Sequence, residues 1–231
     1  TGARFAATRS SGAAVAWNET LVLAAGETLN LGQAQDGCRC WLALRGGLAV
    51  PQVMGSRSTV LPAGFGGHLG RALLAGDVLP CEPGVGEVRP LRTCPPSGDS
   101  DAPLRVVAGP QAGLFDDAGL AAFFNSPYRV DPASDRRGLR LTGAAVAHAR
   151  VELPSQGVLP GAVQVPPDGR PIILGWDGPA TGGYPVIAGV ITADLPRLAQ
   201  LRPGDAVRFM TIELRAAREL PAAHWTFEEL G

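Results

Sequence analysis

The segment from Ser155 to Thr192 places the strongest constraint on the fold of this 231-residue chain. It contains three short apolar runs rich in β-branched residues, at 163–165, 172–174 and 186–192, with glycine and proline clusters between them. Runs this short, closed by turn residues, are typical of buried strands and not of helices. The turns carry most of the segment's polar side chains. Two interpretations follow: a β-barrel with polar turns, or a β scaffold that presents a binding or catalytic surface.

The charged residues exclude several function classes. The formal net charge is -1, which argues against a nucleic-acid or anionic-membrane partner held by bulk electrostatics. Every basic residue is an arginine, so the chain has no P-loop lysine, Schiff-base lysine or biotin-acceptor lysine. A site for ATP or biotin would therefore need groups from a partner, or would have to use arginine.

The four cysteines, Cys38, Cys40, Cys81 and Cys94, lack the C-x-x-C spacing of redox and zinc sites. They predict buried free thiols in a cytoplasmic protein. The longest apolar runs are too short to span a bilayer, and no signal peptide is visible. Because the sequence opens at Thr1 directly in strand-like alternation, we expect part of the first domain to precede it.

A triplet that ends in glycine and an acidic residue occurs three times. The copies are Ala25-Gly26-Glu27, Ala75-Gly76-Asp77 and Pro203-Gly204-Asp205. Glycine adopts positive φ and a carboxylate can accept from nearby backbone amides, so each copy predicts a tight turn that leads into a strand. The positions of the copies, early and late in the chain, predict two related β domains.

Three further segments have clear patterns. Residues 38–44 have an alternating pattern and are flanked by Gly37 and Gly46-Gly47, and residues 104–108 form an apolar run. Both segments predict strands. Residues 114–125 predict the one clear helix, with Asp116 and Asp117 in its first turn. Its expected core-facing residues are Leu120, Phe123 and Phe124.

Composition divides the chain into four parts. Residues 93–103 are polar and proline-rich, without periodicity, and predict a linker. We therefore expect an N-terminal β-barrel domain at 1–92, a C-terminal β-barrel domain at 104–215, and a tail at 216–231.

The common catalytic signatures are absent from the sequence. There is no G-x-S-x-G, G-x-G-x-x-G after a strand, H-E-x-x-H or S-x-x-K motif. His68, His148 and His224 are far apart, so no metal site is expected. Carboxylates are then the best candidates for acid or base, and Asp177 and Asp135 each lie in a glycine-flanked loop.

Two arginines are candidates for holding an anion. Arg57 lies among hydroxyl residues and glycines in the long loop 45–70, and Arg136 lies in the charged turn at 132–143. Guanidinium groups in such turns can bind a carboxylate or phosphate through two hydrogen bonds. Ordinary solvated arginines are the alternative for both positions.

Several motifs, in the same order along almost the whole chain, resemble those of one family. They are Gly46-Gly47, Gly55-Ser56-Arg57-Ser58-Thr59, Gly109-Pro110-Gln111, Ser134-Asp135-Arg136, Gly161-Ala162-Val163-Gln164-Val165-Pro166, Thr181-Gly182-Gly183-Tyr184-Pro185, Ala193-Asp194-Leu195 and Arg202-Pro203-Gly204-Asp205. The family is that of the 5-oxoprolinase C subunits, also called KipA-like proteins, which is similar to half of the carboxyltransferase domain of urea carboxylase. The resemblance implies a mainly β chain of two cyclophilin-like β-barrel domains with few short helices, the first of them incomplete.

The resemblance also implies partners and a reaction. Members of the family work with two further 5-oxoprolinase subunits, the A subunit and the KipI-like B subunit. Together they open the lactam of 5-oxo-L-proline to L-glutamate while hydrolysing ATP. ATP would be bound by, or shared with, one of these partners, and this chain would carry no metal or attached biotin. The physical logic is that a lactam is a poor electrophile, and phosphorylation of its carbonyl oxygen would weaken the amide resonance and create a leaving group.

The reaction implied by the resemblance suggests roles for residues of its motifs and for Asp177, which lies in a glycine-flanked loop. Arg57, Arg136 and the backbone amides of Gly182 and Gly183 would hold anionic groups, and Gln164 would bond the lactam. The remaining assigned residues are Asp177, Tyr184 and Asp135, as catalytic groups that orient substrate or move protons, and Thr181, as a substrate-binding residue.

The chain departs from the family pattern in its central loop. It has Gln156 where the family usually has glutamate, and Gly178-Pro179-Ala180 where an Arg-Gln-Thr run is usual. Two other functions therefore stay open: a carboxyltransferase-type module of a urea or allophanate amidolyase system, and a non-catalytic protein that binds a KipI-like histidine-kinase inhibitor.

Overall fold

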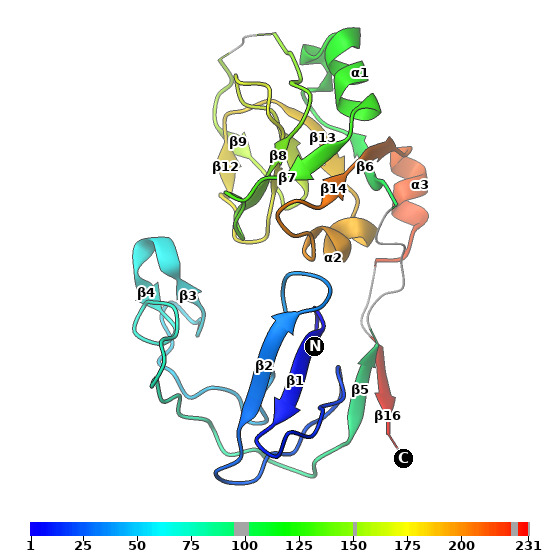
Figure 1. Cartoon of the computed structure of the whole chain (residues 1–231). Coiled ribbons are helices and arrows are strands. Elements are labelled where there is room, and N and C mark those ends of the chain that lie inside the picture. Colours follow the sequence, from blue (N-terminus) through cyan, green and yellow to red (C-terminus); the bar gives the residue numbers. More distant parts are fainter. Residues whose placement is uncertain (95–101, 150–151, 223–225, 231) are drawn as a thin grey trace.

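The structure is a computed structural model that describes residues 1–94, 102–149, 152–222 and 226–230 (Figure 1). One eight-stranded sheet dominates the second half of the chain, in the order β14-β7-β8-β11-β10-β13-β6-β15. Its strands are β6 (Leu104–Ala108), β7 (Tyr128–Val130), β8 (Gly138–Thr142), β10 (Ala162–Gln164), β11 (Ile172–Leu174), β13 (Val186–Val190), β14 (Ala206–Val207) and β15 (Phe209–Thr211).

This sheet curls into a nearly closed barrel. The two strands at its edges, β14 and β15, follow one another in the chain with only Arg208 between them. The first and last strands of the sheet are therefore brought together, which leaves little exposed edge. The mainly β prediction is confirmed, and so are strands at the three apolar runs and at 104–108.

The core of the barrel is aromatic at one end. Phe123 of α1 (Asp117–Asn125) stacks on Phe209 of β15, with ring centroids 4.3 Å apart, and Tyr128 packs against both. Phe123 and Tyr128 are fully buried, and each such side chain contributes about 1.5–3 kcal/mol of burial free energy. The helix predicted at 114–125 is confirmed as α1, and it supplies part of this packing. It begins later than expected, at the cap residue Asp116, whose side chain accepts from Gly119 N.

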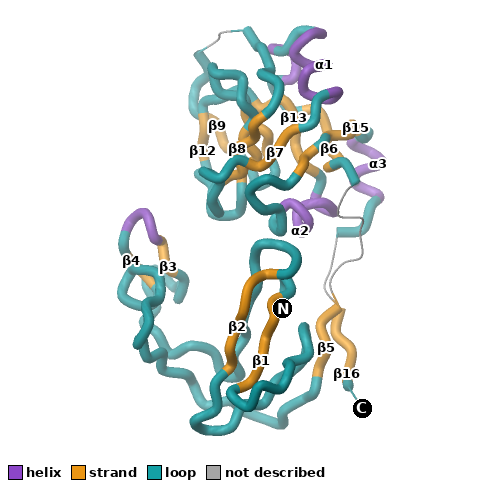
Figure 2. The backbone as a smooth tube through the Cα atoms, viewed as in Figure 1, coloured by secondary structure: helices purple, strands orange, loops and turns teal. Residues whose placement is uncertain are grey.

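Short helical turns complete the second half. They are η2 (Ala112–Leu114), η3 (Thr192–Asp194), α2 (Leu195–Leu198) and α3 (Leu214–Glu219). Figure 2 shows how little of the chain is helical beside the strands and loops. A separate two-stranded sheet, formed by β9 (Gln156–Gly157) and β12 (Thr181–Gly182), lies at one side of the barrel.

The first half contains only two-stranded sheets among its described residues. They pair β1 (Phe5–Arg9) with β2 (Leu29–Ala34), β3 (Thr59–Val60) with β4 (Phe65–Gly66), and β5 (Leu91–Cys94) with β16 (Thr226–Glu229). The short turn η1 (Leu61–Ala63) joins β3 to β4. The β5–β16 pairing returns the end of the chain to the first half (Figure 1).

The predicted strand at 38–44 is wrong. Only Cys40 in this segment makes a β-bridge, to Gly2, and Trp41 and Leu42 are 54% and 68% exposed. Alternation gives a strand only where a hydrogen-bond ladder continues along it, and the ladder here is short: Ala3 N donates to Arg39 O, and Thr1 and Trp41 exchange bonds. The cysteines are free as expected, but the prediction that they are buried is also wrong, because Cys38 and Cys81 are exposed.

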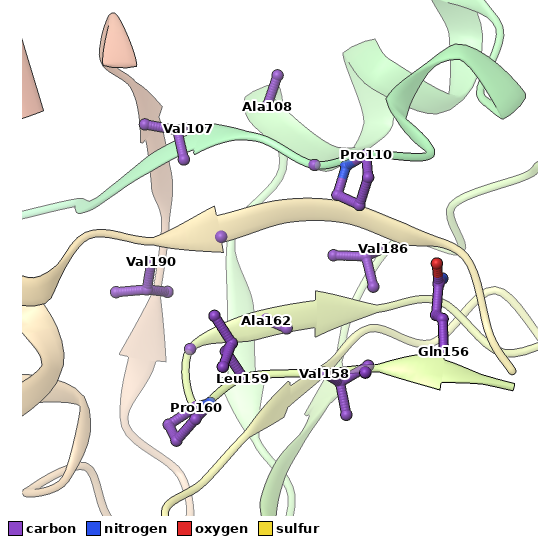
Figure 3. Close-up of a pocket in the computed structure, with 14 residues that line it drawn as sticks. Val107, Ala108, Pro110, Gln156, Val158, Leu159, Pro160, Ala162, Val186 and Val190 are labelled. Atoms are coloured by element: carbon purple, nitrogen blue, oxygen red, sulfur yellow. The ribbon is translucent and has the colours of Figure 1, made fainter. Parts of the chain in front are cut away.

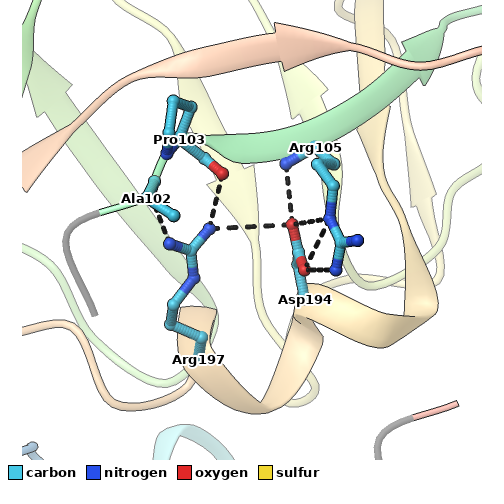
Figure 4. A network of polar contacts seen from close by, with 5 residues as sticks. All are labelled: Ala102, Pro103, Arg105, Asp194 and Arg197. Carbon is cyan, nitrogen blue, oxygen red and sulfur yellow. Dashed lines mark hydrogen bonds and ion pairs between the residues drawn. The ribbon is translucent and has the colours of Figure 1, made fainter. Parts of the chain in front are cut away.

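The predicted linker falls mostly outside the described residues. Thr93 and Cys94 belong to β5, and 95–101 are not described. At the C-terminal end of the predicted linker, an ion-pair network fixes the start of β6 (Figure 4). Asp194, only 5% exposed, accepts from Arg105 N and its guanidinium, and lies 3.6 Å from Arg197. Arg197 donates in turn to the carbonyls of Ala102 and Pro103, so the chain enters the barrel at a fixed point.

Candidate functional site

The small β9–β12 sheet forms one side of the candidate site. Gly182 lies directly opposite Gln156, and Thr181 lies opposite Gly157. A further bond from Val158 N to Ala180 O extends the pairing. Residues 156–158 and 180–182, which the sequence places in separate loops, are therefore held together beside the barrel.

Gln164 reaches this sheet from the barrel wall. Its position on β10 is opposite Val186 of β13, and the residue is only 4% exposed. A Cβ atom at residue 182 would lie 2.5 Å from Gln164 Nε2, so the amide occupies the space beside Gly182. That nitrogen is buried and has no hydrogen-bond partner among the described residues.

The side-chain amide of Gln156 is held in place by the amide of Gln111. Val186 N donates to Gln111 Oε1 at 3.1 Å, and Gln111 Nε2 donates to Gln156 Oε1 at 3.0 Å. Gln156 Nε2 is then left buried without a partner in the described part of the chain. Gln156 and Gln164 thus each keep an unused buried N–H₂ group, and both residues neighbour Gly182.

A cavity of about 310 Å³ adjoins one of these residues, Gln156. Val107, Pro110, Leu159, Val186 and Val190 supply much of its apolar lining, and Gln156 is its polar side chain (Figure 3). None of the described residues that line it is charged. An apolar cavity with a few placed hydrogen-bond donors is the usual form of a small-molecule site.

An exposed ion pair lies in the loop that leads to β12. Arg136 Nε is 2.9 Å from Asp177 Oδ2, and the two side chains are 55% and 52% exposed. The backbone supports the contact, since Asp177 N donates to Arg136 O. The structure therefore brings together two of the predicted site residues that are 41 positions apart.

Asp135 has a different setting. It pairs with Arg137, Nε to Oδ2 at 3.0 Å, and also accepts from the backbone N–H groups of Arg137 and Gly138. Desolvation opposes ionisation of this carboxyl, but the hydrogen bonds from Arg137 and Gly138 together hold its pKa below the usual value. These bonds hold the tight turn before β8.

The other predicted residues divide into two groups. Thr181, Gly183 and Tyr184 lie on the β12 turn, where Tyr184 is 45% exposed. Arg57 belongs to the first half: it donates to Val50 O and lies 3.5 Å from Glu82. Both of these partners of Arg57 therefore come from the first half of the chain.

The residues give a poor fit to a bound nucleotide or metal. Arg57, Arg136 and Arg137, which are the arginines nearest the predicted anion sites, each pair with a carboxylate. Among the residues that the structure describes, no group of three or more His, Cys, Asp or Glu side chains could hold a metal ion. The donor set that remains, a pair of amide N–H₂ groups, suits an uncharged oxygen acceptor.

Sequence reasoning missed Gln111 and the role of Gln156. The available signal was the Gly109-Pro110-Gln111 turn directly after the run at 104–108, which places a polar side chain at the end of a buried strand. Its contact with Gln156 joins residues 45 positions apart. Nothing in local pattern predicts such a pairing.

The fold is a nearly closed β-barrel with a small, mainly apolar cavity beside β9. Residues 1–211 match the family described as carboxyltransferase domain, subdomain A and B, and the chain belongs to that family. It is 41% identical over 202 residues to the C subunit of 5-oxoprolinase from Escherichia coli, a match that covers 85% of this chain and 64% of the relative. The chain thus spans less than two thirds of that protein.

Two fungal proteins extend the comparison. The chain is 32% identical over 228 residues to urea amidolyase of Lachancea kluyveri, covering 88% of this chain and 12% of that protein. The crystal structure of the K. lactis urea amidolyase is similar with a TM-score of 0.81 and 30% identity, over 95% of this chain and 15% of that one. The resemblance inferred from the sequence motifs is confirmed. Within the described ranges, no helix has the length and apolar character needed to cross a membrane.

Proposed function

We propose that this chain is part of a component of an ATP-dependent 5-oxoprolinase, which opens 5-oxo-L-proline to L-glutamate together with its A and B subunits. The observation that carries the proposal is the 41% identity to a C subunit of 5-oxoprolinase across 85% of this chain. The paired Arg136 and Asp177, with the buried amide of Gln164 beside Gly182, support a site for a small polar substrate at the β12 turn.

The geometry supports a proposed role for each of these residues. Asp177 and Tyr184 are exposed on neighbouring turns, where they can contact a substrate held between this chain and a partner. Arg136 holds the carboxylate of Asp177 in position, where it can accept a proton or orient a water molecule. Gln164, and the backbone N–H groups of Gly182 and Gly183, are donors for substrate oxygens.

The nucleotide belongs to a partner in this proposal. The chain has no lysine, and the arginines at its predicted anion sites are neutralised by Glu82, Asp177 and Asp135. No step in this chain is therefore assigned to ATP. The complex is proposed to work in the cytoplasm, in keeping with four free cysteines, two of which are exposed.

A carboxyltransferase-type role is the second candidate. It is supported by the family match and by the similarity to the K. lactis urea amidolyase structure. Because the chain contains no lysine to carry biotin, this role would require a separate biotin carrier. A non-catalytic protein that binds a KipI-like kinase inhibitor is the third.

The test is reconstitution. The full-length protein containing this chain is co-purified with its A and B partners, and ADP release is measured with and without 5-oxo-L-proline. We expect 5-oxoproline-dependent release only when all three are present. Equal release by the mixture without this protein would overturn the first proposal, and carboxyl transfer from a carboxylated biotin carrier to urea would support the second.

A further inference from the structure

Gly182 has two glutamine neighbours with unused amide donors, Gln156 as its strand partner and Gln164 in contact with it. Gln156 lies opposite Gly182 in the β9–β12 pair, so its side chain and the Cβ direction of Gly182 share a face. The space where that Cβ would lie is filled by Gln164 Nε2. Gln164 Nε2 therefore lies against Gly182, and Gln156 is the strand partner of the same glycine; the Nε2 atoms of both lack partners among the described residues.

An unmade hydrogen bond at a buried group is costly. Leaving a buried donor unsatisfied costs about 1–3 kcal/mol, and native structures contain few such groups. Two of them belong to neighbours of Gly182, and one of these, Gln156, also lines a cavity of about 310 Å³; together they point to an acceptor that binds there.

The orientation of Gln156 is determined by its neighbours. A backbone N–H can only donate, so Val186 N fixes the oxygen of the Gln111 amide toward itself and the nitrogen of that amide toward Gln156. The Gln111 nitrogen donates to Gln156, which places the oxygen of Gln156 at this contact. Gln156 must then present its N–H₂ group on the other side. Gln111 is a positioning residue in this chain of contacts.

We propose that Gln156 and Gln164 form a two-donor site for the carbonyl oxygen of a small neutral amide or lactam, with the apolar remainder of the ligand in the adjoining cavity. The neutrality follows from the lining, whose described residues include no charged side chain that could balance a carboxylate. The inference rests on the proposed function in one respect: it assigns the ring carbonyl of 5-oxoproline to these two amides, so the carboxylate of that substrate would have to lie outside the uncharged lining.

Gln111 gives the proposal its sharpest test. In Gln111→Glu, one carboxylate oxygen still accepts from Val186 N, but the other can no longer donate to Gln156. Gln156 then turns its nitrogen toward the new carboxylate and its oxygen toward the ligand. One donor of the site becomes an acceptor, although no atom that touches the ligand has been replaced.

The probes are 2-pyrrolidinone, a neutral lactam, and L-proline, which has a carboxylate but no ring carbonyl. Side-chain amide resonances of the ¹⁵N-labelled full-length protein are followed by NMR during titration with each. We expect 2-pyrrolidinone to shift the Gln156 and Gln164 amide signals, and L-proline to leave them unchanged. Gln111→Glu and Gln156→Glu should each weaken 2-pyrrolidinone binding by about tenfold or more, as expected for the loss of one donor to a buried oxygen.

Gln33→Glu is the matched control, because it makes the same chemical change at an exposed position of β2. It should bind 2-pyrrolidinone as the unmodified protein does. The proposal is overturned if 2-pyrrolidinone shifts neither amide at its highest usable concentration, if L-proline shifts them equally, or if Gln111→Glu binds as tightly as Gln33→Glu.

The outcomes separate this inference from the proposed function. The NMR titration needs no partner protein, so a positive result stands even if reconstitution gives no 5-oxoproline-dependent ADP release. Conversely, if reconstituted turnover is found and Gln156→Glu leaves the KM for 5-oxo-L-proline unchanged, the two-donor site is wrong and the proposed function remains.

Discussion

Gln200 binds the backbone of Arg39 through both polar atoms of its amide. Gln200 Oε1 accepts from Arg39 N at 2.9 Å, and Gln200 Nε2 donates to Arg39 O at 3.0 Å. The oxygen also accepts from Cys38 N at 2.9 Å. The side chain thus bonds the backbone of residues 38–39 as a neighbouring strand would. It connects the first half of the chain to the barrel just after α2.

Replacement of Gln200 by alanine should loosen this connection. Three hydrogen bonds of about 0.5–1.5 kcal/mol each are lost, and we expect a loss of about 2 kcal/mol in local stability. Hydrogen exchange at the Cys38 and Arg39 amides should accelerate by at least tenfold. The exposed Gln52→Ala provides the control. Unchanged exchange at both amides would show that Gln200 does not hold this loop.

The repeated turn motif has the same geometry in all three copies. Gly26, Gly76 and Gly204 have φ values of 81°, 89° and 90°. In each copy, the carboxylate that follows accepts from the backbone N–H three residues earlier, as Asp205 Oδ2 does from Arg202 N at 2.7 Å. The predicted turns are therefore confirmed at the level of individual hydrogen bonds, although the described residues directly after Asp77 form no strand.

Gly204→Ala should destabilise the barrel by about 1 kcal/mol. No atom of the described residues lies within 4 Å of the added methyl group, so the cost comes from the positive φ alone. Gly113→Ala is the matched control, because its surroundings are equally open and its φ is not positive. Urea denaturation of both variants tests this, and equal midpoints would contradict the backbone explanation.

Tyr128 should make the barrel sensitive to alkali. Burial raises the pKa of Tyr128 to about 12, and its hydroxyl donates to Ala122 O at 3.0 Å. The unfolded tyrosine ionises near pH 10, so the contribution of this group is complete below that pH and is lost as the pH rises toward 12. Between pH 9 and 11 the free energy of unfolding should fall by about 1 kcal/mol more than in Tyr128→Phe. Parallel losses in the two proteins would exclude this cause.

Local sequence pattern correctly predicted the strands that pair with other strands of the large sheet. The runs at 104–108, 172–174 and 186–190 became strands because each supplies buried β-branched side chains to a sheet that closes around them. The alternating segment at 38–44 has an equally clear pattern, but its pairing is limited to a bridge with Gly2, and Trp41 and Leu42 stay exposed. Pattern alone does not reveal whether a partner strand is present.

The candidate site was predictable only in part. Family motifs located the β12 turn, and the structure pairs Asp177 with Arg136 as two members of the predicted set. The relay from Val186 through Gln111 to Gln156 depends on contacts across 75 and 45 positions of the chain and on the direction of each amide. Neither these long-range contacts nor the direction of each amide can be predicted from residue type or spacing.

The Arg136–Asp177 ion pair supports the most direct test of the proposed function. Because both side chains are more than half exposed, the pair contributes little to stability, and Asp177→Asn should leave the melting temperature unchanged. Glu219→Gln, which breaks the exposed pair between Arg215 and Glu219 on α3, is the control.

The measurement is 5-oxo-L-proline-dependent ADP release by the full-length protein reconstituted with its A and B partners. Loss of an acid or base group typically costs about 10²–10⁴-fold in rate, so we predict that Asp177→Asn lowers kcat by at least a hundredfold while Glu219→Gln keeps full turnover. Equal turnover by the unmodified protein and Asp177→Asn would contradict the assignment of the reaction to this end of the barrel.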